Sequence, residues 1–63
     1  MKITLHNPYI KKEMFVEEDE TYYGNELQKI YDNKTEFIIF TDANTGNVIT
    51  IRPSNWAMIE VEK

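Results

Sequence analysis

Apolar and polar residues alternate with a period of two near the start of the chain, which is the pattern of a half-buried β-strand. The first such segment covers residues 2–6, and an Asn-Pro pair follows it as a turn signal. In residues 9–16 one parity is occupied by Ile10, Met14 and Val16. Lys12 falls on that same parity and interrupts the apolar stripe. The pattern therefore predicts one short strand and allows a second one in residues 9–16.

Alternation is more regular in the C-terminal half. Segments 36–42 and 47–52 flank the sequence ANTG, and Gly46 suits the left-handed position of a hairpin loop. Ile49 and Ile51 are expected to face one side, with their neighbours facing the other. A further alternating segment, residues 57–62, follows. These segments predict an antiparallel meander of three strands.

One segment has the period of a helix, and it covers about residues 25–32. Asn25 is a good N-cap residue, and Gln28 three positions later completes a capping-box pattern. The apolar stripe consists of Leu27, Ile30 and Tyr31, at positions i, i+3 and i+4. The fold class expected for residues 1–63 is a single small α+β domain, mostly β: an antiparallel meander of three to five strands with one short helix.

Composition narrows the classes of function. Cysteine is absent, which excludes disulfides and thiolate metal sites, and one histidine cannot build a zinc site alone. A net charge of −4 opposes direct binding to nucleic acid, and no apolar run reaches the roughly 20 residues of a membrane helix. We therefore expect a cytoplasmic protein without cofactor or metal. A chain of this size buries a small core, which favours a homo-oligomer.

Catalytic patterns are missing. The only histidine, His6, and the only serine, Ser54, have no nucleophile-elbow or triad spacing around them. No glycine-rich phosphate loop exists, and the segment 42–47 fits a hairpin turn better than a calcium loop. The sequence predicts no catalytic residues.

An acidic segment precedes two adjacent tyrosines, and its residues are Glu17, Glu18, Asp19, Glu20, Tyr22 and Tyr23. A run of acids is typically a solvated loop. It could alternatively present charge to a basic groove of a nucleic-acid-binding protein, with the tyrosines as interface anchors. Both interpretations stay open.

A second group surrounds the only arginine and the only tryptophan. Arg52, Asn55 and Trp56 lie within five positions, around a Pro-Ser turn. Trp56 is expected to close one end of the core. Alternatively, the three side chains hold an anionic or planar ligand by a charge-assisted pair and by stacking.

Three hypotheses of function follow. The first is a non-enzymatic protein, encoded by a phage or mobile element, that docks on a host protein and inhibits or modulates it through the acidic segment. The second is a homo-oligomer that sequesters an anionic small molecule, such as a nucleotide, between subunits through Arg52, Asn55 and Trp56. The third is an assembly component that pairs through its sheet edges.

Overall fold

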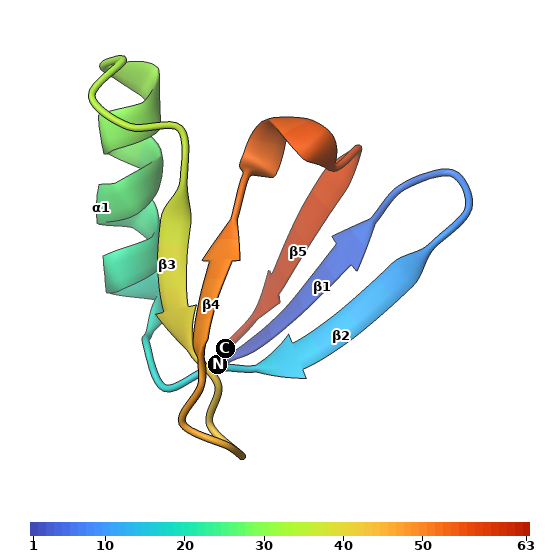
Figure 1. Cartoon of the computed structure of the whole chain (residues 1–63). Coiled ribbons are helices and arrows are strands. Elements are labelled where there is room, and N and C mark those ends of the chain that lie inside the picture. Colours follow the sequence, from blue (N-terminus) through green and yellow to red (C-terminus); the bar gives the residue numbers. More distant parts are fainter.

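The computed structural model describes all 63 residues and contains five strands and one α-helix (Figure 1). A single 3₁₀ turn, η1, joins the last two strands. In chain order the elements are β1 (Lys2–His6), β2 (Lys11–Phe15), α1 (Glu20–Tyr31), β3 (Ile38–Thr41), β4 (Val48–Ile51), η1 (Pro53–Asn55) and β5 (Met58–Glu62). The expected α+β, mostly β fold is confirmed.

All strand pairs are antiparallel. Strands β2, β1 and β5 form one sheet in that order, and β3 and β4 form a second, two-stranded sheet. An isolated bridge between Val16 and Asp42 joins the end of β2 to the end of β3. Backbone hydrogen bonds of 2.9 Å on either side of this bridge, from Glu17 to Thr41 and from Ala43 to Phe15, reinforce the junction. This junction links the two sheets beyond the ends of β2 and β3, while β2 and β3 themselves do not pair with each other.

The core lies between the inner faces of the two sheets. Its buried side chains are Ile3, Leu5, Val16, Ile38, Phe40 and Ile51. They alternate along their strands as a half-buried sheet requires. Helix α1 covers one side of this core, and the ring of Tyr22 meets the ring of Phe40 edge-on, with centroids 5.9 Å apart.

The predicted start of the helix is wrong. Helix α1 begins at Glu20, and its N-cap is Asp19, whose carboxylate accepts a hydrogen bond of 2.9 Å from the backbone N–H of Tyr22. Asn25 instead lies inside the helix with an exposed side chain. The longer helix presents Tyr23 and Leu27 to the core together with Ile30, a stripe at i, i+4 and i+7. Packing of this stripe against the core explains why helix α1 begins at Glu20, within the acidic segment.

The predicted meander of the last three strands is also wrong. β3 and β4 form the expected hairpin, but β5 pairs with β1 and not with β4. The turn η1 carries the chain from one sheet to the other, so the last strand adds to the edge of the N-terminal hairpin (Figure 1). Trp56 lies before this strand, and Ala57 is exposed and outside it. The segment 9–16 does contain a strand, β2.

The hairpin loop between β3 and β4 has the predicted chemistry. The carboxylate of Asp42 accepts hydrogen bonds from the backbone N–H groups of Asn44, at 2.7 Å, and Thr45, at 3.1 Å. Gly46 has a φ of 76°, the left-handed conformation that glycine adopts without steric cost. The loop is thus a turn stabilised by hydrogen bonds among its own residues.

No helix of the structure is long and apolar enough to cross a membrane.

Candidate binding cleft

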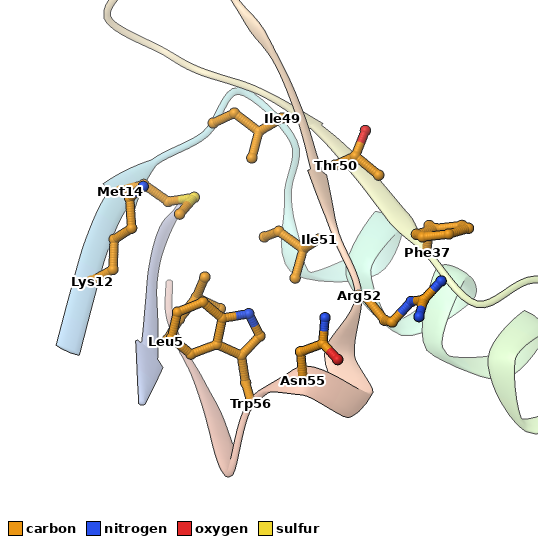
Figure 2. Close-up of a pocket in the computed structure, with 10 residues that line it drawn as sticks. All are labelled: Leu5, Lys12, Met14, Phe37, Ile49, Thr50, Ile51, Arg52, Asn55 and Trp56. Carbon is orange, nitrogen blue, oxygen red and sulfur yellow. The ribbon is translucent and has the colours of Figure 1, made fainter. Parts of the chain in front are cut away.

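A cleft of about 430 Å³ opens between β4 on one side and the hairpin of β1 and β2 on the other (Figure 2). Its lining residues are Leu5, Lys12, Met14, Phe37, Ile49, Thr50, Ile51, Arg52, Asn55 and Trp56. A second hollow of about 410 Å³ adjoins it towards the β3–β4 turn and shares Lys12, Met14 and Ile49 with it. Together the two form a groove that runs along β4.

The three residues of the second predicted group lie in this one cleft. Arg52 follows β4, Asn55 ends η1, and Trp56 comes directly after it. The turn is held by backbone hydrogen bonds from Asn55 to Arg52, at 3.0 Å, and from Trp56 to Pro53, at 3.1 Å. Trp56 is half-buried and packs against the core, as expected for a side chain that closes its end. One indole therefore serves the core and lines the cleft.

Arg52 lies at the rim of the cleft with two neighbours. Its guanidinium is 3.6 Å from the carboxylate of Glu36 and lies 4.9 Å from the centre of the Phe37 ring. Figure 2 shows the guanidinium directed towards that ring. The side chains of Arg52 and Glu36 are 44% and 77% exposed, so water screens their attraction. An exposed pair of this kind leaves Arg52 available to a stronger anionic partner.

Lys12 is a residue of the cleft that sequence reasoning missed. It lies directly opposite Leu5 in the pairing of β1 with β2, so both side chains stand on the inner face of the sheet. Leu5 is buried, whereas Lys12 is exposed, lines the cleft and forms no ion pair. The signal was present in the sequence, because Lys12 is the one charge on the apolar parity of residues 9–16.

The charge of the cleft is opposite to that of the protein. Its lining contains two cations, Lys12 and Arg52, and no carboxylate, although the chain has a net charge of −4. The remaining lining is mostly apolar or aromatic. A ligand suited to this cleft would combine an anionic group with apolar or flat surface.

The acidic segment has a different environment. Glu18 accepts a hydrogen bond of 2.8 Å from the backbone N–H of Thr41, which ties the segment to β3. Partial burial opposes ionisation of Glu18, but backbone hydrogen bonds together hold the pKa of its carboxyl below the usual value. Glu17 and Glu20 are exposed and have no bonded partner. Two of the four acidic side chains, those of Glu18 and Asp19, therefore accept backbone hydrogen bonds that stabilise the fold.

Both tyrosines after the acidic run pack inwards. The ring of Tyr23 stacks on Phe40 with centroids 6.4 Å apart, and the hydroxyl of Tyr22 donates a hydrogen bond to the carbonyl of Ile39. Burial raises the pKa of both phenols. The two rings thus contribute to the core, and neither stands out from the surface as a free anchor.

The outer face of the larger sheet carries only paired charges near the single histidine. His6 lies 3.1 Å from the carboxylate of Glu60 across the β1–β5 pair. No group of three histidine, cysteine or acidic side chains is arranged to hold a metal ion.

The chain matches no protein-family model, no curated protein and no solved structure.

Proposed function

We propose that the protein is a non-enzymatic binding protein that docks on a partner protein, and that the cleft beside β4 recognises an anionic segment of that partner. The observation that carries the proposal is the lining of the cleft, in which two cations and a tryptophan meet without any carboxylate in an acidic chain. The adjoining hollow also contains the carboxylates of Glu13 and Asp42, so the preference for an anionic ligand is confined to the cleft itself.

The cations stand on opposite walls of the cleft. Lys12 comes from β2, and Arg52 comes from the end of β4. The planar guanidinium of Arg52 matches a carboxylate or phosphate with two parallel hydrogen bonds, whereas Lys12 acts as a mobile point charge. Trp56 supplies a large, stiff apolar surface between them, of the kind that anchors interfaces. The three side chains could contact one ligand at the same time.

A second candidate is an anionic small molecule with a flat ring, such as a nucleotide, held by the same cleft in a homo-oligomer. It is favoured by the placement of Arg52, Asn55 and Trp56 around one cavity, since stacking and a charge-assisted pair suit a base and a phosphate. Both candidates need Lys12 and Arg52, and they differ in whether the ligand is a protein segment or a small molecule.

The test uses charge reversal with a matched control. The double variant K12E/R52E and the control K34E/K63E have the same net charge, but Lys34 and Lys63 lie outside the cleft. Each is titrated with acidic peptides, with nucleoside phosphates and with basic peptides, and Trp56 fluorescence reports binding. We expect an anionic probe to bind the wild type and the control and to bind K12E/R52E at least about tenfold more weakly. If no anionic probe changes the fluorescence of the wild type, the proposal is wrong.

Docking through the acidic segment remains a separate proposal, in which exposed carboxylates imitate a nucleic-acid backbone. Only Glu17 and Glu20 have carboxylates free for that role, since Glu18 and Asp19 bond to the backbone. The variant E17S/E20S therefore tests it without removing a side-chain hydrogen bond or ion pair of the fold. A basic DNA-binding protein that binds the wild type and this variant equally well would exclude the imitation.

A further inference from the structure

Strand β4 has one unpaired edge, and the cleft lies along this strand. It pairs with β3 only, so the backbone groups on its other side have no strand partner. Residues Ile49 to Arg52 line the main cavity, and Val48 and Ile49 line the adjoining hollow. The groove therefore combines side-chain pockets with an available strand edge.

The register of the hairpin identifies the unpaired groups. Asp42 donates a backbone hydrogen bond of 2.9 Å to the carbonyl of Asn47. Bonded and non-bonded pairs alternate along an antiparallel ladder, which assigns the next bonded pair to Phe40 and Ile49. It follows that Val48 and Thr50 direct their N–H and C=O groups away from β3, towards the free edge.

This edge differs from the other two free edges of the molecule. The edge strands β2 and β5 read KKEMF and MIEVE and carry charged side chains, which protect an edge from further pairing. β4 reads VITI, contains neither charge nor proline, and leaves Val48 72% exposed. The outer edge of β3 is occupied, because Thr41 bonds to Glu17 and Glu18 and the carbonyl of Ile39 accepts a hydrogen bond from Tyr22. Only the edge of β4 therefore lacks protection against an added strand.

We infer that the ligand of the cleft is an extended acidic peptide that adds to β4 as an additional strand. The inference rests on the function proposed above and specifies the ligand. Peptide backbone groups pair with Val48 and Thr50, while alternate apolar side chains cover Met14 and Trp56. The acidic side chains between them lie on the same face of the extended sheet as Arg52, where their charge is complementary to the guanidinium.

The probe is an octapeptide of alternating valine and glutamate, with alternating valine and lysine as the charge control. Binding is followed by Trp56 fluorescence, and hydrogen exchange of single backbone amides is followed by NMR. We expect the acidic peptide to bind and to slow exchange at the amides of Val48 and Thr50, which have no partner in the free protein. The amide of Gly24, which lies in α1 away from the cleft, serves as the reference that does not change.

Two further peptides test the backbone pairing directly. In one peptide every second backbone amide carries an N-methyl group, and in the other peptide the remaining amides carry it. Only one of these two sets of amides faces β4. We therefore expect the peptide methylated on that set to bind at least about tenfold more weakly and the other to keep its affinity, because each lost bond leaves an acceptor unpaired.

The outcomes separate the inference from the proposed function. If the acidic peptide binds, but the exchange of Val48 and Thr50 is unchanged and both methylated peptides bind equally, strand addition is wrong and the anionic cleft stands. If only nucleoside phosphates bind, the peptide ligand is wrong and the small-molecule candidate replaces it. If no anionic probe binds, both fail.

Discussion

Replacing Asp19 by alanine removes the N-cap of α1. The carboxylate of Asp19 accepts a hydrogen bond of 2.9 Å from the backbone of Tyr22, one of the N–H groups that a helix start leaves without a partner. Loss of such a cap costs about 1 kcal/mol of unfolding free energy. For 63 residues, an unfolding entropy of about 2.1 cal/mol/K per residue converts this loss into a fall in Tm of about 8 °C.

Asn25 provides the matched control, because the sequence pattern assigned the N-cap to it. In the structure Asn25 is exposed within α1, and its side chain forms no hydrogen bond. Since alanine is a better helix former, Asn25→Ala should raise the unfolding free energy by about 0.5 kcal/mol. Melting followed by circular dichroism compares the two variants. A larger fall in Tm for Asn25→Ala than for Asp19→Ala would refute the assigned helix start.

Further predictions concern turns, acid stability and the cleft. Gly46→Ala should lower the unfolding free energy by about 1 kcal/mol, because the φ of Gly46 is 76°. Gly24→Ala should raise it by up to about 1 kcal/mol, because Gly24 lies in α1 with open space where a Cβ would stand. Chemical denaturation measures both changes. The folded-state pKa of Glu18 is lowered, so its contribution to stability is present above the usual pKa of 4.5 and is lost as the pH falls through the folded value. Glu18→Gln should thus weaken the protein at pH 7 and reduce the loss between pH 7 and about pH 3, and denaturation curves parallel to those of the wild type would contradict this. Glu36→Gln frees Arg52 and should tighten binding of the acidic octapeptide by up to about threefold in the fluorescence titration; weaker binding would show that Glu36 positions the guanidinium.

The helix shows where sequence reasoning reached its limit. Leu27 and Ile30 were correctly placed on an apolar stripe, because their spacing is a local property. Tyr31 was wrongly placed on the same stripe, since it is 82% exposed. The start was misplaced because Asn25 and Gln28 imitate a capping box, while the true cap, Asp19, is hidden in a run of acids. Tyr23 extends the stripe by one turn only because Phe40 offers a surface to pack on. That surface belongs to another part of the chain, so local pattern alone could not reveal it.

The strands show the same division between local and distant information. Alternation correctly predicted which side chains of β4 face the core, and Gly46 correctly marked the hairpin turn. The pairing of β5 with β1 depends on the course of η1 between the sheets, for which alternation contains no signal. Of the residues that line the cleft, Arg52 and Trp56 were found as rare residue types. Lys12 was missed, although it is the one charge on the apolar parity of residues 9–16, because its position opposite Leu5 is a matter of strand pairing.

The pairing of β1 with β5 has a consequence for how the chain folds. Lys2 lies opposite Glu62, so the first strand completes its sheet only with the last one (Figure 1). Closing so long a loop demands much chain entropy before any contact compensates it, which places folding in the slower range of small domains. Until that closure, β1 exposes on one edge the backbone groups that β5 later covers. During synthesis this edge is open to foreign strands for as long as β5 is missing, and the charged side chain of Lys2 beside it would then discourage aggregation.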